Sequence, residues 1–463
     1  MTSKILNHAE VASNIDLLSV WIKAQIAYNG LPGLSIGIVY DQELVWAAGF
    51  GYADIERKVE AMPRTIYRIA SITKLFTSTA VMQLRDAGKL RLDDPITHYL
   101  PWFKIQNRHL EAAPITVRHL LTHTSGLPRE AAFPYWTDSN FPSREQIRQT
   151  IPQQETILPT ETEWKYSNLG LALAGEIVAA VSGQDYPDYV QQHIFDPLDM
   201  NSTYIRSLKP DHPRLATGYG RRLPDGSRGV SPFTDSLGLT SAFNIASTIE
   251  DLSRFAMLQF RTDPGSGSQI LGGRTLSEMQ RVHWLEPDWQ AGWGIGFRIT
   301  RQNGKTYIGH SGAVLGYRAM LQICPADKMA VVVLTNADDG DPLVYVEKTF
   351  QWVGRAISKA VTREPEVAEP DPAWQQYVGK YRNAWGDSQV MVFNSELVMI
   401  GCALPDPTLA MSKLVPVAEH TFRIETKDGF SANGELVIFE MDEEGKVQRV
   451  KMGENFTYPQ AEW

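Results

Sequence analysis

Cysteine is nearly absent from this chain of 463 residues, in which Cys324 and Cys402 are the only two. Two cysteines allow one disulfide bond at most, which excludes a scaffold held together by several disulfides. Neither cysteine lies at a zinc-ligand spacing from a histidine. We therefore expect no metal site, and nothing in the sequence calls for an organic cofactor.

Long basic runs and long apolar runs are missing as well. Lysine and arginine total 44 against 53 acidic residues, giving a formal charge of −9. The lack of a basic cluster disfavours nucleic acid as a partner, and no apolar run is long enough to cross a bilayer. The N-terminal residues lack the apolar core of a signal peptide, and their apolar positions recur at helical spacing. These features predict a soluble, cytoplasmic protein, or a periplasmic one if a signal peptide has been removed.

A change in composition divides the chain near residue 363. Residues 363–372 contain three prolines and four acidic residues, which is typical of a linker. Residues 1–362 and 373–463 are therefore predicted to form separate domains. After the linker, short β-prone runs alternate with turn signals, which predicts a small antiparallel barrel or sandwich. These runs are 390–393, 397–400, 414–417, 421–424, 436–441 and 447–452.

Before the linker, strand and helix signals are mixed. Residues 34–39 with 44–48, and 319–324 with 330–335, read as two hairpins, and residues 90–205 read as mainly helical. A nearly all-apolar helix is predicted from Ile72 to Ala87, with Ser71 as its N-cap and Gly88 as its stop. A helix that is apolar all round is buried, so its first turn can form the floor of a cleft.

The pair Ser71-x-x-Lys74 lies at the start of this helix, where residues three apart share one face. If the turn is buried, the lysine loses its proton readily, and a neutral amine can activate a serine nucleophile. The alternative is an ordinary capping serine beside a surface lysine. The apolar helix that follows argues against a surface lysine.

Two further motifs could complete a site around Ser71. Tyr166-Ser167-Asn168 precedes a predicted helix at 169–181. A phenol has a pKa near about 10 and becomes a base only where a cation such as Lys74 favours the phenolate. The carboxamide of Asn168 can touch a substrate carbonyl, although Ser167 or Asn168 could equally be a helix cap. His310-Ser311-Gly312-Ala313 opens a β-rich stretch, where histidine and serine can donate hydrogen bonds and glycine permits close approach.

The order and spacing of these three motifs resemble those of the serine β-lactamase and penicillin-binding-protein superfamily. The likeness is strongest to its class C β-lactamase, D-peptidase and family VIII esterase branch, and covers roughly residues 10–360. Supporting stretches include YRIASITKLFTSTAVMQL, ITVRHLLTHTSGLP and HSGAVLGYRAMLQICPADKMAVVVLTN. The resemblance implies an α/β fold, with an antiparallel sheet flanked by helices and a helical subdomain at about 90–205. The segment YVGKYR, from Tyr377, resembles the start of lipocalin-like barrels appended to some of these hydrolases.

The resemblance also implies roles for individual residues. Ser71 becomes the nucleophile, Lys74 its proton partner, and Tyr166 the general base that later protonates the leaving group. Asn168 touches the substrate carbonyl, and the backbone N–H groups of Ser71 and Ala313 form the oxyanion hole. His310, Ser311 and Gly312 join Ala313 in the expected substrate-binding wall.

His310 departs from most β-lactamases of this superfamily, which carry lysine at that position. The sequence therefore predicts a carboxylesterase-like serine hydrolase, with at most weak β-lactamase activity, acting on a small ester, amide or short peptide. A D-aminopeptidase or D,D-peptidase is the alternative enzyme. A penicillin-binding sensor or scaffold that acylates without turnover is the alternative outside the enzymes. The oligomeric state stays open, and an oligomer fits the resemblance.

Several other features are weaker candidates. His119-Leu-Leu-Thr-His123 lacks the glutamate of a zinc-binding H-E-x-x-H motif, so both histidines are expected in the scaffold. Arg129 and Glu130 are expected at the rim of the cleft. Aromatic residues in predicted loops can line an apolar cleft or anchor the loops, and the sequence leaves both readings open; they are Phe133, Tyr135, Trp136, Trp284, Trp289 and Trp293.

Overall fold

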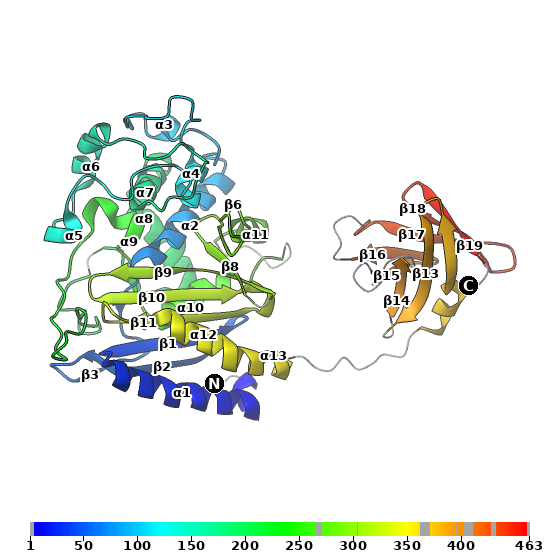
Figure 1. Ribbon diagram of the computed structural model, residues 1–463, viewed down its shortest axis with the longest axis horizontal. Helices are drawn as coiled ribbons and strands as arrows, with labels where there is room; N and C mark the ends of the chain where they lie inside the picture. The colour runs from blue at the N-terminus through cyan, green and yellow to red at the C-terminus, as the bar shows by residue number, and fades with distance from the viewer. Residues whose placement is uncertain are drawn as a thin grey trace. The chain divides into compact units, whose positions relative to one another are not determined.

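The computed structural model describes residues 4–206, 208–263, 270–302, 304–361, 371–393, 396–401, 411–426 and 432–460. Internal contacts divide the chain into two compact units, Met1–Val361 and Thr362–Trp463 (Figure 1). Most of the predicted linker at 363–372 lies outside the described residues, as does Cys402. The other cysteine, Cys324, is a buried free thiol.

A nine-stranded antiparallel sheet forms the centre of the first unit, in the order β3-β2-β1-β11-β10-β9-β8-β7-β6. Both predicted hairpins are confirmed, one as β1 paired with β2 and the other as β10 paired with β11. The strands are β1 (Gly33–Tyr40), β2 (Glu43–Asp54), β3 (Val59–Glu60), β6 (Trp284–Leu285), β7 (Ala291–Trp293), β8 (Arg298–Gln302), β9 (Lys305–Val314), β10 (Tyr317–Cys324) and β11 (Met329–Thr335). A separate pair joins β4 (Tyr67–Arg68) to β5 (Ala246–Ser247).

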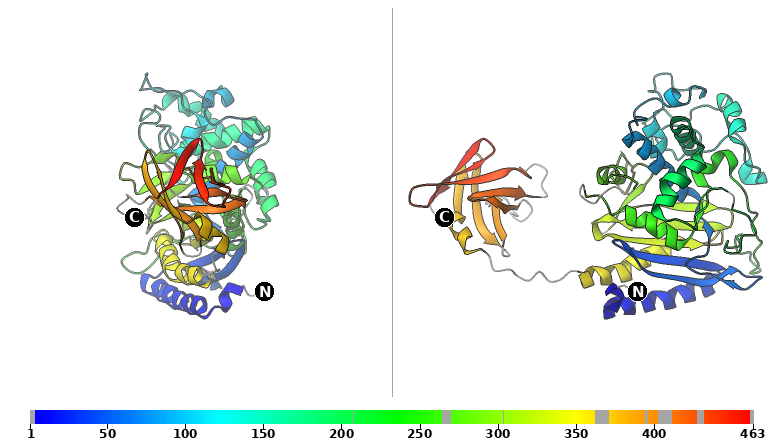
Figure 2. Two further views of the ribbon diagram at one scale, coloured as in Figure 1. Left: turned by 90° about the vertical axis from the view of Figure 1, so that its right-hand side faces the viewer. Right: turned by 180° about the vertical axis from the view of Figure 1, so that it is seen from behind.

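Helices cover both faces of this sheet, as Figures 1 and 2 show. On one face lie α1 (Ala9–Asn29), α12 (Pro342–Thr349) and α13 (Arg355–Val361), whose apolar side chains pack on β1 and β11. The predicted N-terminal amphipathic helix is thus confirmed as α1. On the other face lie α2 (Thr73–Asp86) and α10 (Ile249–Leu258). Because strand side chains alternate between faces, the sheet can supply both hydrophobic cores.

The predicted helical region is confirmed as a set of short helices and loops that packs on α2. It contains α3 (Ile96–Tyr99), α4 (Val117–Thr122), α5 (Tyr135–Asp138), α6 (Arg144–Thr150), α7 (Asn168–Ser182) and α8 (Tyr186–Val190). The helix α7 is capped by the Ser167 hydroxyl, which accepts a hydrogen bond from the Gly170 N–H. It ends at Gly183, whose φ of +72° suits glycine. Two more helices, α9 (Thr240–Phe243) and α11 (Gly273–Gln280), come from later in the chain.

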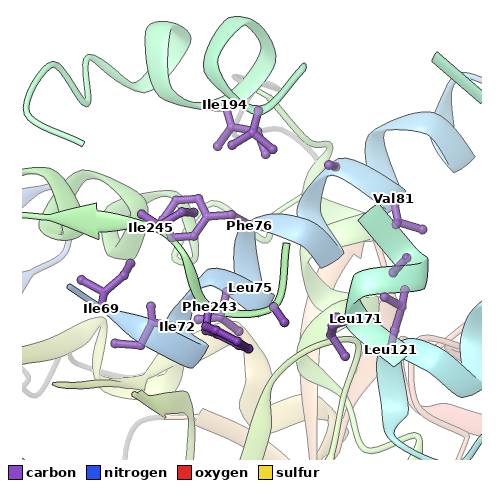
Figure 3. Packing of buried hydrophobic residues seen from close by; sticks show 14 of the residues in the cluster. Ile69, Ile72, Leu75, Phe76, Val81, Leu121, Leu171, Ile194, Phe243 and Ile245 are labelled. Carbon is purple, nitrogen blue, oxygen red and sulfur yellow. The ribbon is translucent and has the colours of Figure 1, made fainter. Parts of the chain in front are cut away.

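The predicted helix over 72–87 is confirmed as α2, but Ser71 is not its N-cap. Residues Ala70–Ile72 form a 3₁₀ turn, and Ile72 occupies the cap position with no side-chain capping bond. Figure 3 shows Leu75 and Phe76 of α2 packed among apolar residues of other segments, including Phe243 of α9. The apolar environment predicted for this helix is therefore present.

The second unit is a closed barrel of eight antiparallel strands, which fits the predicted lipocalin-like domain. All six predicted runs lie within strands, from β13 to β18. The sequence missed the first and last strands, which pair to close the barrel and carry few β-branched residues. The strands are β12 (Gly379–Asn383), β13 (Gly386–Phe393), β14 (Glu396–Gly401), β15 (Ser412–Ala418), β16 (Thr421–Glu425), β17 (Leu436–Met441), β18 (Val447–Met452) and β19 (Asn455–Gln460).

Across the described residues of both units, none of the helices has the length and apolar character that a membrane span requires.

Candidate active site

Lys74 is fully buried in the first turn of α2. Its Nζ lies 3.0 Å from Ser71 Oγ and 2.8 Å from the carbonyl oxygen of Ala242 in α9. Burial lowers the pKa of the Lys74 ammonium well below its usual value, while the Glu130 charge raises that pKa and the Arg129 charge lowers it further. The alternative of a surface lysine is therefore excluded, and the buried lysine that the apolar helix favoured is present. A neutral Lys74 can donate to Ala242 and still offer its lone pair to the Ser71 hydroxyl.

The turn that presents Ser71 is strained. Ala70, directly before the serine, has a φ of +47°, a left-handed conformation that residues with a Cβ rarely adopt. Such a conformation costs on the order of 1–3 kcal/mol and persists only where the surrounding structure fixes it. The Ile69 N–H donates to the Ile245 carbonyl at 2.9 Å, which ties this turn to the segment after α9. The strained backbone at Ala70 is therefore fixed by a contact with another segment of the chain.

The Tyr166 hydroxyl donates a hydrogen bond to Ser71 Oγ at 2.9 Å. Two basic side chains lie over its ring, with Lys74 Nζ 4.9 Å and the Arg129 guanidinium carbon 5.0 Å from the ring centroid. Burial nevertheless raises the pKa of the Tyr166 phenol, although the Ser71 hydrogen bond and the Arg129 charge oppose that shift. The phenol therefore keeps its proton, which differs from the phenolate that the sequence suggested. Burial of the ring outweighs the neighbouring charge.

Asn168, the first residue of α7, is anchored by Glu130. Its Nδ2 donates to Glu130 Oε1 at 2.8 Å, while its Oδ1 is buried and has no hydrogen-bond partner among the described residues. Glu130 Oε2 accepts a hydrogen bond from the buried Tyr135 hydroxyl. The backbone N–H of Asn168 donates to the Arg129 carbonyl at 2.7 Å. Arg129 and Glu130 therefore lie at the site, where they join the loop before α5 to the start of α7.

The third motif lies on β9, beside the Ser71 turn. Gly312 fits there only without a side chain, because a Cβ at this position would lie 2.1 Å from the Ile69 carbonyl oxygen. His310 points to the same face of the sheet as Gly312, since residues two apart on a strand share a face. Ser311 points to the opposite face, where it lines a crevice of about 170 Å³ with Met320 and Leu343. The structure thus brings His310 and Gly312 to the Ser71 side, but not the Ser311 side chain.

Beyond Gly309, none of the described strands pairs with β9 on the side of β8, so this edge is open there. β8 pairs with β9 only as far as Arg298 opposite Gly309, whereas β10 pairs along β9 up to Val314. Val314 and Tyr317 close a two-residue turn, so their pair is hydrogen-bonded. Because hydrogen-bonded pairs alternate along a ladder, the backbone groups of Ser311 and Ala313 face the open edge. An extended substrate backbone can lie along this edge.

The rings of His123, Trp164 and Trp293 pack beside Tyr166 and form an aromatic wall. The ring of His123 lies 4.4 Å from that of Tyr166, and the rings of Trp164 and Trp293 stack at 4.8 Å. His123 Nδ1 accepts the Ser167 N–H at 3.2 Å, and burial together with the Lys74 charge lowers the pKa of the His123 ring well below its usual value. The sequence missed His123 and Trp164 as parts of the site. The adjacency of Trp164 to the Tyr166 motif was the available signal.

The remaining aromatic candidates divide between the two readings. Trp293 belongs to the wall, whereas Tyr135 and Trp136 of α5 pack with Phe141 as anchors. Trp289 is 76% exposed, Trp284 lies in β6 opposite Trp293, and Phe133 packs against the main hydrophobic core.

The second histidine candidate, His119, completes a capping box with Thr116. Its Nε2 lies 3.6 Å from Glu161. In the part of the chain that the structure describes, no group of three or more histidine, cysteine, aspartate or glutamate side chains could hold a metal ion.

Ser71, the buried Lys74 and Tyr166 thus form one hydrogen-bonded cluster beside β9 of the sheet. The family model described as Beta-lactamase matches residues 19–354, more than half of the chain. The chain therefore belongs to the β-lactamase family.

Similarities to individual proteins and solved structures are consistent with this family. The chain is 33% identical over 312 residues to Beta-lactamase-like protein 2 of Dictyostelium discoideum, a match covering 65% of this chain and 55% of that protein. The chain thus spans about half the length of this relative. The octameric penicillin-binding protein homologue from Pyrococcus abyssi is 25% identical, with a TM-score of 0.65, covering 96% of this chain and 100% of that one. A D-stereospecific amidohydrolase from Streptomyces shares the fold at 23% identity, with a TM-score of 0.60, covering 74% of this chain and 98% of that one.

Proposed function

We propose that this chain hydrolyses a carboxylic ester or amide through an acyl-enzyme on Ser71, with carboxylic esters as its main substrates. The observation that carries this proposal is the position of Ser71 Oγ. It lies 3.0 Å from the buried amine of Lys74 and 2.9 Å from the phenol of Tyr166. One neighbour can accept a proton and the other can donate one, as acylation requires.

In acylation, Ser71 Oγ attacks the substrate carbonyl carbon while Lys74 takes the hydroxyl proton. The pKa of Lys74 is lowered and that of Tyr166 is raised, so the amine is the better base and the phenol the better acid. When the bond to the leaving group breaks, Tyr166 supplies a proton to that group, and the proton on Lys74 restores the phenol. Water then attacks the acyl-enzyme, which releases the acid and returns the proton to Ser71.

We assign the oxyanion hole to the backbone N–H groups of Ser71 and Ala313. The close fit of Gly312 against the Ile69 carbonyl supports this assignment, because it holds the open edge of β9 beside the Ser71 turn. Ala313 directs its N–H to that edge. Donors arranged in this way typically contribute about 3–4 kcal/mol to transition-state stabilisation. Asn168 is the proposed contact to an N–H group of the substrate, since its Oδ1 can accept a hydrogen bond and is buried without a partner among the described residues.

The open edge of β9 favours a second candidate function, hydrolysis of D-amino-acid amides or short D-peptides. An ester with a small alcohol does not need a strand edge, whereas a peptide can pair its backbone with one. A third reading, a penicillin-binding sensor that acylates without turnover, is an outcome of the same test.

The test compares wild type with Ser71→Ala on p-nitrophenyl acetate, short-chain alkyl esters, D-amino-acid amides and nitrocefin. Ser227→Ala, in an exposed loop, is the matched control. We expect the Ser71 variant to lose activity on every substrate and the control to keep it. Near-normal turnover by the Ser71 variant would overturn the proposal. A lasting mass increase on wild type after β-lactam exposure, without ester turnover, would instead identify the sensor.

We further propose that the chain self-associates, because its Pyrococcus abyssi homologue is octameric. Light scattering on purified protein measures the mass directly. A monomeric mass at micromolar concentration would contradict this proposal and leave the assignment of Ser71 intact.

A further inference from the structure

One ring nitrogen of His310 has a partner and the other does not. Nδ1 lies 2.6 Å from the carbonyl oxygen of Ser311. A carbonyl can only accept, so Nδ1 carries the hydrogen of this bond. The other nitrogen, Nε2, is buried and has no hydrogen-bond partner among the described residues, in a side chain that is only 4% exposed. A buried polar atom without a partner is rare in a folded protein and points to an unmet ligand.

The ring of His310 is neutral. Burial lowers its pKa to about 3, and the charge of Lys74 contributes to the shift. A neutral imidazole with hydrogen on Nδ1 has a lone pair on Nε2. His310 therefore offers the site a hydrogen-bond acceptor. This reverses the expectation from the sequence, in which His310 donates to a substrate carbonyl or carboxylate.

His310 lies beside Tyr166 in the site. Its ring centroid is 6.2 Å from that of Tyr166, the proposed proton donor to the leaving group, and 6.0 Å from that of Trp293. It is also the first residue of β9 beyond the last pair with β8, at Gly309. The His310 ring thus lies next to Tyr166 and Trp293, where the pairing of β9 with β8 ends.

We infer that His310 selects the leaving group, by accepting a hydrogen bond at Nε2 from a neutral N–H or O–H donor and by disfavouring a carboxylate at the same position. This inference rests on the proposed function of Ser71. It names a substrate class within that function: esters or amides whose leaving group carries a hydroxyl, amine or carboxamide near the bond that is cleaved. A carboxylate there would place its charge against a lone pair, in a site where burial strengthens the repulsion.

The inference is tested with three acetate esters that differ only in the leaving group. Acetyl glycolamide presents an N–H donor, acetyl N,N-dimethylglycolamide is neutral without a donor, and acetyl glycolate presents a carboxylate. Rates are divided by the rate of hydroxide-catalysed hydrolysis of each ester, which removes intrinsic reactivity. For wild type we expect kcat/KM for the glycolamide ester to exceed the other two at least tenfold.

Three variants separate acceptor chemistry from shape. His310→Leu removes the acceptor and should bring the glycolamide and dimethylglycolamide esters within about twofold of each other. His310→Gln retains an acceptor oxygen and should restore part of the preference. His310→Lys should shift the preference towards the glycolate ester.

If a variant does not fold, the preference of wild type for the glycolamide ester still tests the inference. Ser71-dependent hydrolysis of p-nitrophenyl acetate without a preference for the glycolamide ester would overturn the role of His310 and leave the function of Ser71 standing. A preference that persists unchanged in His310→Leu would also overturn it. If wild type hydrolysed none of the esters in a Ser71-dependent way, the proposed function itself would be overturned.

Discussion

The Ala242 carbonyl oxygen lies 2.8 Å from Lys74 Nζ, although the two residues are 168 positions apart in the chain. This bond turns the amine so that its lone pair can face Ser71. Burying an ammonium costs more free energy than a hydrogen bond to one neutral carbonyl returns. The arrangement therefore suits a neutral amine. Lys74 is therefore held as a base by α9, an element that no local sequence pattern connects to α2.

The first prediction concerns the pH dependence of hydrolysis. Because neutral Lys74 is the active form, kcat/KM should rise with pH as the amine loses its proton and then level off. Glu130 raises the pKa of Lys74 and Arg129 lowers it. Glu130→Gln should therefore move the acidic limb of the profile to lower pH, and Arg129→Gln should move it to higher pH, each by about half to one unit.

The two variants control for each other, because their pH profiles are expected to shift in opposite directions. The glutamine at position 130 keeps an oxygen that can accept from Asn168 Nδ2, so the change removes charge more than structure. Shifts of the same sign in both variants would show that the limb reports a group other than Lys74.

The second prediction tests Tyr166 as the proton donor to the leaving group. Tyr166→Phe should reduce hydrolysis of alkyl esters by about 10²–10⁴-fold, the usual range for loss of a general acid. Its effect on p-nitrophenyl esters should be much smaller, because p-nitrophenolate departs without a proton. Tyr99→Phe, which loses a hydroxyl that donates to Asp94 and not to Ser71, is the control. Equal losses on both ester types would argue against an acid role for Tyr166.

The third prediction concerns the fit of β9 against the Ser71 turn. In Gly312→Ala the new Cβ would meet the Ile69 carbonyl at 2.1 Å, so strand and turn must separate. We expect a loss of stability of about 1–3 kcal/mol and a loss of activity greater than tenfold. Gly229→Ala is the matched control, since nothing lies within 4 Å of a Cβ there. Thermal unfolding and ester hydrolysis of both variants give the comparison, and identical behaviour would contradict the predicted clash.

Much of this architecture could be predicted because its signals are local. The apolar texture of residues 72–87 predicted a buried α2, and from it a buried Lys74, which is fully buried in the structure. Turn residues between β-prone runs predicted two of the hairpins of the sheet and six of the eight barrel strands. Periodicity, turn chemistry and caps act within a few residues of one another, so a single sequence contains them.

The features that the sequence did not reveal depend on distant contacts. Ser71 reads locally as an N-cap, and only the family resemblance, not a local pattern, connected it to Tyr166, which lies 95 residues further on and donates to its hydroxyl. The anchoring of Asn168 by Glu130 spans 38 residues, and neither residue type predicts the other. The tautomer of His310 follows from the position of the Ser311 carbonyl, which the path of β9 determines.

The fourth prediction follows from the neutral His310 ring. Its pKa is about 3 in the folded protein, because of burial and the Lys74 charge, and about 6.5 when unfolded. As pH falls below about 6.5, the unfolded state takes up a proton that the folded ring refuses. The stability that the neutral His310 ring contributes is therefore fully present above about pH 6.5, and it is lost progressively as pH falls towards about 3. At pH 4.5 the loss from this ring amounts to about 2–3 kcal/mol.

His310→Gln removes this ring and should shrink the difference in unfolding free energy between pH 7 and pH 4.5 by that amount. The variant can be less stable than wild type at both pH values, and the prediction concerns only the difference between them. Urea titrations followed by tryptophan fluorescence measure it. His98→Gln, at an exposed histidine outside the site, is the control substitution. An unchanged difference in His310→Gln would mean that the ring takes up protons equally in both states, and the acceptor at Nε2 would then lose its basis.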